Sequence, residues 1–376
     1  MLHFKTELEE LRINNLYRLQ QCHDNKLLNF GENDYLGLRK NKVISSAIKR
    51  SIDENGNGSG ASALVTGYFS SHKNVENAIS NALNFEDGIF YQSGFTANLS
   101  FFKTIIDSKF EIFLDKLCHA SIYEGVKNTN AKITRYPHLN IDKLEQDLKK
   151  SKISKKIIVT DSVFSMDGDC ADISSLIDLS NKYKTLLFID DAHGFGVYGK
   201  NGLGLLEHQG LLKKNKNNLI HLTTFGKSAG ITGAVLCANK ETIEFLRQKS
   251  KDYIYTTAPP PYIADGVLSA FQLIMNGSQL RDKLNENIGL FKQSFKFPKL
   301  LLNVDGPIQP IMICDNEKVL KIQKKAIQKG IYLSAIRSPT VPKSLSRIRI
   351  TIGANHTKDE ILFLNQILNE CIKNEI

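Results

Sequence analysis

One lysine, Lys227, stands among small residues in the stretch 223–230, directly after the apolar run 219–222. Such a run predicts a buried strand, and burial opposes the charged form of a lysine. The amine is therefore either paired with an anion or has a lowered pKa, and an amine with a lowered pKa is the nucleophile that Schiff-base chemistry needs. Taken alone, a lysine in a loop after a strand is more often structural than catalytic.

An aspartate and a histidine follow another apolar run, 186–189. Asp190 comes directly after this run. Burying an unpaired carboxylate there costs free energy, so Asp190 needs a cationic partner. A structural ion pair or a helix cap explains Asp190 equally well, and His193 is also consistent with a simple turn residue. Asp191 is expected to face solvent or to cap a helix.

Two further features complete the set of polar groups. His119 comes shortly after the apolar run 112–114, although a core position suits a histidine there as well. Gly94 and Phe95 begin an expected helix, whose first backbone N–H groups are a ready anion site or an ordinary helix start.

The joint occurrence of these groups indicates pyridoxal 5'-phosphate. Lys227 supplies the amine for a Schiff base, and Asp190 keeps the pyridine nitrogen protonated so that the ring withdraws electrons. The imidazole of His119 can stack on the flat ring. The helix start at Gly94 can hold the phosphate.

The elements that position these groups alternate between helices and short apolar runs. This alternation predicts an α/β domain with a mostly parallel sheet covered on both faces. Ligands collect at the carboxyl ends of strands in such sheets, so the polar residues after the strands are expected to converge. The runs that we expect to be strands are 89–91, 112–114, 157–160, 186–189, 219–222 and 234–237.

The ends of the chain predict a different organisation. Residues 4–20 have the spacing of an amphipathic helix, and two helices, 262–276 and 278–295, follow the sheet. The remainder indicates a small α+β unit with a helix, 317–329, that stops at Gly330. Its other expected elements are a strand at 332–335, an alternating strand at 347–352 and a helix from Lys358. The predicted division is an N-terminal helical segment, a large cofactor-binding domain and a small C-terminal domain, at 1–42, 43–276 and 277–376.

Composition argues against several classes of protein. The chain has 376 residues, 41% of them hydrophobic, which suffices for a large core. The net charge of +10 comes from scattered lysines in short clusters, which favours solvated faces over nucleic-acid binding. The glycines at 56–60 have the spacing GxGxG and follow an expected helix, which does not match a dinucleotide fingerprint.

Other features bear on the compartment and on metals. The six cysteines are scattered without a CxxC pair, so neither a metal site nor a disulfide framework is indicated. No apolar run has the roughly 20 residues that a membrane span needs. The start of the chain lacks the apolar centre of a signal peptide. A cytoplasmic protein with no membrane partner is expected.

Seven motifs occur in an order that is typical of one family. They are NDYLGL at 33–38, SGFTAN at 93–98, CHASI at 118–122, VFSMDGD at 163–169, DDAHGFG at 190–196, TFGKSAG at 224–230 and AIRSPTVP at 335–342. With these motifs the chain resembles, over nearly its whole length, the α-oxoamine synthase family of fold-type-I pyridoxal-phosphate transferases.

The resemblance implies roles for individual residues. Lys227 would carry the cofactor, Asp190 would face the pyridine nitrogen and His119 would stack on the ring. The other implied cofactor residues are Ser165 and His193 near the ring hydroxyl, Gly94, Phe95 and Thr224 for the cofactor or its phosphate, and Thr256 and Thr257 reaching the phosphate of a neighbouring subunit. The implied substrate residues are Arg337 as carboxylate clamp, Asn33 and Thr340 beside the substrate, His119, and Arg18 for the far carboxylate of the acyl chain.

The resemblance also implies a reaction and an assembly. The motifs are most similar to the branch that condenses L-alanine with a pimeloyl thioester, bound to CoA or to an acyl carrier protein, and releases carbon dioxide and thiol. A homodimer with shared sites is implied. Sister enzymes of the 2-amino-3-ketobutyrate CoA ligase, 5-aminolevulinate synthase and serine palmitoyltransferase types are the alternative. The short chain and Tyr68, where several sisters have threonine, favour the alanine branch.

Overall fold

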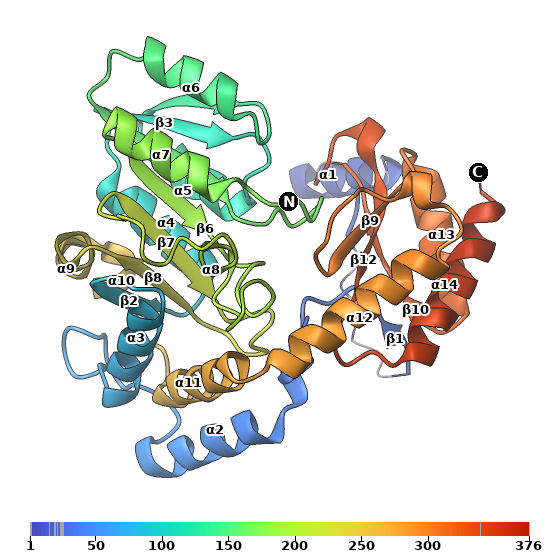
Figure 1. Cartoon of the computed structure of the whole chain (residues 1–376), viewed down its shortest axis with the longest axis horizontal. Coiled ribbons are helices and arrows are strands. Elements are labelled where there is room, and N and C mark those ends of the chain that lie inside the picture. The colour runs from blue at the N-terminus through green and yellow to red at the C-terminus, as the bar shows by residue number, and fades with distance from the viewer. Residues whose placement is uncertain are drawn as a thin grey trace.

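The large part of the molecule is built on one seven-stranded sheet. The computed structural model describes residues 2–14, 16–18, 20, 22, 26–338 and 340–375. The strand order is β2-β8-β7-β6-β5-β3-β4, in which β7, β6, β5, β3 and β4 are parallel and β8 is antiparallel to both of its neighbours (Figure 1). The strands are β2 (Asp87–Tyr91), β3 (Phe110–Asp115), β4 (Lys132–Tyr136), β5 (Lys155–Asp161), β6 (Leu186–Asp190), β7 (Leu219–Thr224) and β8 (Ala234–Ala238). The expected mostly parallel sheet is confirmed.

Helices cover both faces of this sheet, because the central strands are apolar on both sides. Ile157 and Val159 of β5 pack on one face with helices such as α4, whereas Ile158 between them packs on the other. The helices of the large part are α2 (Lys42–Asn55), α3 (Ser70–Ala82), α4 (Gly94–Ile105), α5 (Ala120–Lys127), α6 (Ile141–Lys150), α7 (Ile173–Tyr183), α8 (Leu205–His208), α9 (Lys240–Lys249), α10 (Lys251–Ile254) and α11 (Pro261–Met275).

A second, smaller unit follows the long helix α12 (Ser278–Ser294), which runs from beside α11 toward it (Figure 1). Its antiparallel sheet has the order β11-β12-β9 and is packed against two helices. These elements are β9 (Ile308–Met312), α13 (Asn316–Gln328), β11 (Ser334–Ile336), β12 (Arg347–Thr351) and α14 (Lys358–Lys373). α13 ends before Gly330, whose φ of 87° is the left-handed conformation that glycine adopts most readily.

The strand expected at 332–335 is divided between two sheets. β10 (Ile331–Tyr332) pairs in parallel with β1 (Leu28–Asn29), whereas β11 pairs with β12. The residue between the two strands, Leu333, is fully buried. The chain therefore changes its partner strand at Leu333, whose side chain is buried in the core of the small unit.

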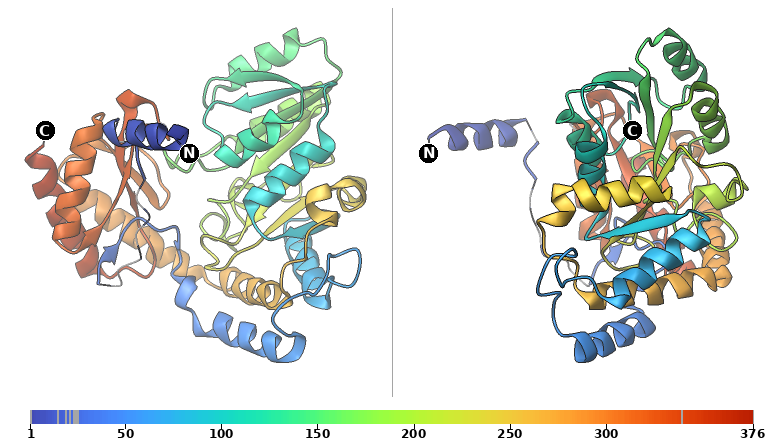
Figure 2. Two further views of the ribbon diagram at one scale, coloured as in Figure 1. Left: turned by 180° about the vertical axis from the view of Figure 1, so that it is seen from behind. Right: turned by 90° about the vertical axis from the view of Figure 1, so that its left-hand side faces the viewer.

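The first helix is shorter than expected. α1 (Leu2–Ile13) ends at Ile13, and residues 16–18 continue without helical structure; positions 15 and 19 of the expected helix lie outside the described residues. Figure 2 shows α1 standing away from the rest of the chain. In the described part of the chain, no helix is both long and apolar enough to cross a membrane.

Candidate active site

The carboxyl ends of the central strands surround one cavity with a volume of about 280 Å³. Eight of the residues predicted from the sequence line it. They are Asn33, Gly94, Phe95, His119, Asp190, His193, Thr224 and Lys227. They come from loops that follow different strands and from the N-terminal segment, so the parallel sheet brings together residues far apart in the sequence.

Lys227 lies in a tight turn directly after β7. The turn is closed by a hydrogen bond of 2.9 Å from the N–H of Gly230 to the carbonyl of Lys227. Gly230 has a φ of +68°, and a Cβ atom there would meet the backbone nitrogen of Arg39 at 2.3 Å. Burial lowers the pKa of Lys227 to about 8, although the nearby Asp190 favours its charged form. Near physiological pH the amine is therefore neutral far more often than that of an ordinary lysine.

Asp190 ends β6 and is almost fully buried. Its Oδ1 accepts a hydrogen bond from the N–H of Ala192 at 3.1 Å, and its Oδ2 accepts one from Asn98 Nδ2 at 2.9 Å. Asp161, at the end of β5, is its register partner. Burial and then the charge of Asp190 raise the pKa of Asp161 well above its usual value, which favours the neutral form of Asp161.

The prediction that Asp191 faces solvent is wrong. Its side chain is fully buried and lies opposite His221, with Nε2 of the histidine at 3.4 Å. Its carboxylate accepts hydrogen bonds from Ser162 Oγ and from the N–H of Leu205 at the start of α8. Asp190 and Asp191 point to opposite sides because successive side chains alternate at the end of a strand.

The two histidines of the cavity are held differently. Tyr35 Oη lies 2.6 Å from Nδ1 of His193, which is buried. Burial, followed by the positive charges of Lys227 and Arg349, lowers the pKa of His193 well below its usual value. His119 precedes α5 and caps it, because its Nδ1 accepts the N–H of Ser121. Burial also lowers the pKa of His119, against the attraction of Asp190.

The start of α4 forms a polar cradle beside the end of β7. Ser93 caps the helix by accepting the N–H of Thr96 at 3.2 Å. A Cβ atom on Gly94 would lie 2.6 Å from Cγ2 of Thr224, so only glycine allows this approach. The N–H groups of Gly94 and Phe95 donate to no described residue and remain open to an anion.

This set of groups fits pyridoxal phosphate. The cradle at Gly94 suits the phosphate, the carboxylate of Asp190 suits a protonated ring nitrogen, and Lys227 offers an amine with a lowered pKa. All three line one cavity.

Ser165 does not line the cavity, but its loop is held by the small unit. Arg349 of β12 donates from Nε to the carbonyl of Ser165 at 2.7 Å and from Nη2 to Asn33 Oδ1 at 2.9 Å. Arg347 pairs with Asp167 of the same loop. The small unit therefore fixes two edges of the site.

The remaining substrate residues lie in a second hollow of about 450 Å³. Arg18, Arg337 and Thr340 all line it. Arg18 Nη2 donates to Thr340 Oγ1 at 3.1 Å, and Arg337 Nη2 donates to the carbonyl of Tyr17 at 3.3 Å. These three residues therefore lie together, and none of them lines the first cavity.

Thr256 and Thr257 are exposed and do not line the first cavity. Gln92, which precedes the cap residue Ser93 of α4, donates a hydrogen bond from Nε2 to the carbonyl of Thr257 at 3.2 Å.

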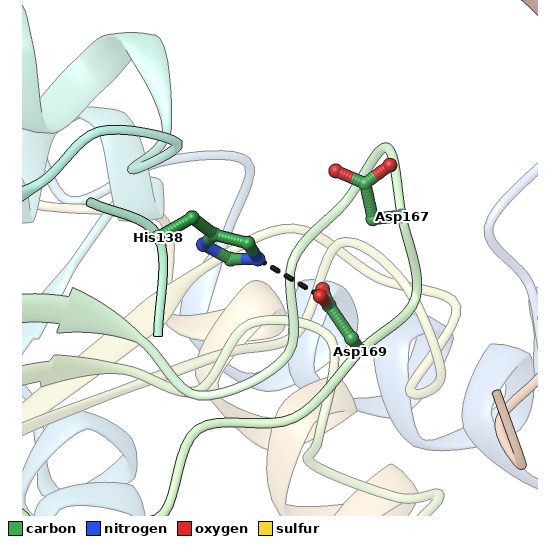
Figure 3. Close-up of side chains that lie close together, drawn as sticks. All are labelled: His138, Asp167 and Asp169. Carbon is green, nitrogen blue, oxygen red and sulfur yellow. Dashed lines mark hydrogen bonds and ion pairs between the residues drawn. The ribbon is translucent and has the colours of Figure 1, made fainter. Parts of the chain in front are cut away.

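A histidine and two aspartates near the VFSMDGD loop have ligand atoms within 4.8 Å of one another (Figure 3). His138 already uses both ring nitrogens, one toward Asp115 at 3.0 Å and one toward Asp169 at 2.8 Å. Burial opposes its charge, but these carboxylates outweigh burial and raise the pKa of His138 to about 9. The positive imidazole is thus an ionic bridge between two loops.

Several residues of the site were missed from the sequence. Asn98, Ser121 and Tyr35 lie inside the motifs quoted above, yet their type alone gave no sign of a contact. Asp161 directly follows the predicted strand 157–160, and that position was a signal of a site residue. Arg349 lies in the alternating strand 347–352 beside another arginine. Its contact with Asn33 could be found only from the three-dimensional structure.

Comparison with known proteins identifies one family for nearly the whole chain. The profile of the aminotransferase class I and II family matches residues 25–366. The 8-amino-7-oxononanoate synthase of Dechloromonas aromatica is 38% identical over 98% of both chains. That of Buchnera aphidicola is 39% identical over 95% of this chain and 92% of the relative.

Solved structures agree in fold. The 8-amino-7-oxononanoate synthase of Francisella tularensis superposes with a TM-score of 0.81 at 30% identity, over 94% of this chain and 99% of that one. A serine palmitoyltransferase from S. paucimobilis with bound pyridoxal phosphate and myriocin reaches a TM-score of 0.90 at 24% identity, over 99% and 97%. The second likeness bears on the fold alone.

Proposed function

The chain belongs to the aminotransferase class I and II family, among the 8-amino-7-oxononanoate synthases, and from this premise we propose that it condenses L-alanine with a pimeloyl thioester. The products are 8-amino-7-oxononanoate, carbon dioxide and free thiol, in the synthesis of biotin. The observation that supports this most strongly is the placement of Lys227, Asp190 and the cradle at Gly94 around one cavity. The cofactor is pyridoxal 5'-phosphate.

The residues that would hold the cofactor are divided between its two ends. Lys227 would bind the aldehyde, and Asp190 would face the ring nitrogen. His119 would stack on the ring, and His193 and Ser165 would lie near the ring hydroxyl. Gly94, Phe95 and Thr224 would hold the phosphate, with Thr256 and Thr257 of a second subunit.

When bound, pyridoxal phosphate withdraws electrons from the α-carbon of the amino acid, which makes its proton acidic. The chain supplies the remaining chemistry. Nζ of Lys227, whose pKa is lowered by burial, takes the α-proton in its neutral form and later returns a proton to the product. Arg337 would clamp the carboxylate of the amino acid, because its planar group binds carboxylates in a bidentate manner, and it would reach the first cavity from its place in the second hollow.

The acyl substrate would use the second hollow. Arg18 and Thr340, which are hydrogen-bonded to each other, would bind the far carboxylate of the pimeloyl chain, and Asn33 would lie beside the reacting groups. Either CoA or an acyl carrier protein would carry the pimeloyl group as a thioester. Paired assays with the two thioesters distinguish them by the ratio of their kcat/KM values.

We propose a homodimer with shared sites. Exposed apolar side chains support it: Tyr255 is 80% exposed and Val65 is 73% exposed. At Gly56, Gly58 and Gly60 a Cβ atom would meet no atom of the described residues within 4 Å beyond its chain neighbours, so space remains there for a second chain. A cytoplasmic location and the division at residues 42 and 276 remain predictions.

The experiment that tests the function measures thiol release. L-alanine, glycine and serine are each combined with pimeloyl, succinyl, acetyl and palmitoyl thioesters, with pyridoxal phosphate present. The proposal expects the highest kcat/KM for L-alanine with the pimeloyl thioester. Preference for another pair assigns the chain to a sister enzyme of the ligase, aminolevulinate or palmitoyltransferase type.

A further inference from the structure

A chain of hydrogen bonds joins Asp190 to His119 beneath the cavity. Asn98 of α4 places Nδ2 at 2.9 Å from Asp190 Oδ2 and at 2.8 Å from Ser121 Oγ. Ser121 of α5 places its Oγ at 2.7 Å from Nδ1 of His119. Asn98 and Ser121 are both fully buried, and the proposed chemistry assigns no role to either.

The direction of this chain follows from its first member. A carboxylate only accepts hydrogen bonds, so the amide nitrogen of Asn98 faces Asp190. The second hydrogen of the same nitrogen is donated to Ser121 Oγ. Since Ser121 Oγ accepts from Asn98, its own hydrogen is free to point at Nδ1 of His119.

A second contact also indicates that Nδ1 of His119 accepts a hydrogen bond. The backbone N–H of Ser121 also points at Nδ1 of His119, at 3.3 Å. A backbone N–H only donates, so Nδ1 carries a lone pair and the proton of the neutral ring is on Nε2. Nε2 makes no hydrogen bond to any residue in the described ranges, and the ring lines the cavity.

We propose that Asn98 and Ser121 are positioning residues that hold His119 in the Nε2–H tautomer, so that the imidazole offers a hydrogen-bond donor to a carbonyl or carboxylate oxygen of the bound substrate. Without the hydrogen from Asn98, Ser121 Oγ is able to accept from Nδ1–H instead. The ring then presents an acceptor to the cavity. The tautomer is a property of the chain alone, whereas the use of Nε2–H rests on the proposed function.

Nuclear magnetic resonance of the cofactor-free, full-length protein tests the tautomer directly. The protein is labelled with ¹⁵N-histidine, and the His119→Gln variant identifies the signals of His119 by their loss. At a pH where the ring is neutral, the proposal expects a pyridine-type Nδ1 and a pyrrole-type Nε2. A ring protonated on Nδ1, or an even mixture of both tautomers, overturns the proposal whatever the activity of the enzyme.

Variants test the two positioning residues. Asn98→Leu leaves Ser121 Oγ able to accept from the ring, so it should populate the Nδ1–H tautomer and lower kcat about tenfold or more. Ser121→Ala leaves only the longer backbone contact at Nδ1, so it should give a mixture of both tautomers and a smaller loss of kcat. Ser121→Thr keeps the hydroxyl and should match the wild type in both. Ser100→Ala is the matched control, because Ser100 is equally buried and hydrogen-bonded, to Tyr91 and Ser250. An unchanged tautomer in Ser121→Ala and Asn98→Leu, or the same loss of kcat in Ser100→Ala, contradicts the proposal.

Discussion

Asp161 and Asp190 stand opposite each other at the ends of two neighbouring parallel strands, β5 and β6. Two buried carboxylates at adjacent strand ends repel each other when both are charged. The raised pKa of Asp161 reduces this repulsion, because it favours the neutral form of Asp161. Asp190 in turn accepts the hydrogen bond of Asn98 and lines the cavity.

This pair predicts different outcomes for two similar substitutions. Asp161→Asn replaces a neutral acid by a neutral amide and should leave kcat within about threefold of the wild type. Asp190→Asn removes the charge that would face the ring nitrogen and should lower kcat on the order of 100-fold or more. Steady-state assays and titration with pyridoxal phosphate measure both. Equal losses in the two variants would show that the charge is shared rather than held by Asp190.

The chain contains a second lysine with the same lowered pKa, which offers a matched control for Lys227. Burial lowers the pKa of Lys216 to about 8, and its Nζ donates to the carbonyls of Leu83 and Leu212 at 2.6 Å. Lys227→Ala should abolish the visible absorbance of the bound cofactor and lower turnover at least about 1000-fold.

Lys216→Met should keep colour and turnover but lose about 1–3 kcal/mol of unfolding free energy, since two carbonyls lose their donor. Chemical denaturation measures this loss. A colourless Lys216→Met protein would place the cofactor chemistry elsewhere.

The pKa of Lys227 predicts how fast the cofactor-free enzyme captures pyridoxal phosphate at different pH values. Only the neutral amine attacks the aldehyde, so the rate should rise about tenfold per pH unit below pH 8 and level off above it. Stopped-flow absorbance measures this rate. A rate that keeps rising up to pH 10 would mean that Lys227 retains the ordinary pKa of a lysine.

The bridge at His138 predicts a pH-dependent stability. Its folded-state pKa of about 9 lies above the unfolded value, so the stabilisation is fully present below about pH 6.5 and is lost as pH rises through 9. His138→Gln should therefore lose on the order of 2 kcal/mol at pH 6, a figure reduced for the partial exposure of the ring. Urea unfolding at pH 6 and pH 9.5 should show this difference disappearing at the higher pH.

Shared sites predict that two inactive variants restore each other. A mixed dimer of Lys227→Ala with the double variant Thr256→Ala and Thr257→Ala contains one site with a wild-type lysine and wild-type threonines. Mixing and refolding the two should recover up to about a quarter of wild-type activity, since half of the dimers are mixed and each has one intact site. Mixtures no more active than their separate components would argue that each site is built from one chain.

The sequence alone was sufficient for the parts of the site that depend on strand order. Asp190, Lys227 and Gly94 each follow a predicted strand, and parallel strands bring their carboxyl ends together. The orientation of neighbouring residues was harder to predict. Asp191 was expected to face solvent or to cap a helix, whereas its side chain is fully buried and accepts the N–H of Leu205 at the start of α8.

Contacts between distant elements were not predictable from local pattern. Asn98 and Ser121 meet because α4 packs on α5, and Arg349 reaches Asn33 because the small unit lies against the site. No periodicity or spacing encodes such contacts, because they depend on how whole elements pack.

The most direct test of the account is to reduce the protein with borohydride in the presence of pyridoxal phosphate and to map the modified peptide by mass spectrometry. The reduced cofactor should be attached to Lys227, at one per chain, and the Lys227→Ala protein should carry none. Attachment to another lysine, or no stable attachment at all, would contradict the proposal that this amine and Asp190 bind the two ends of the ring.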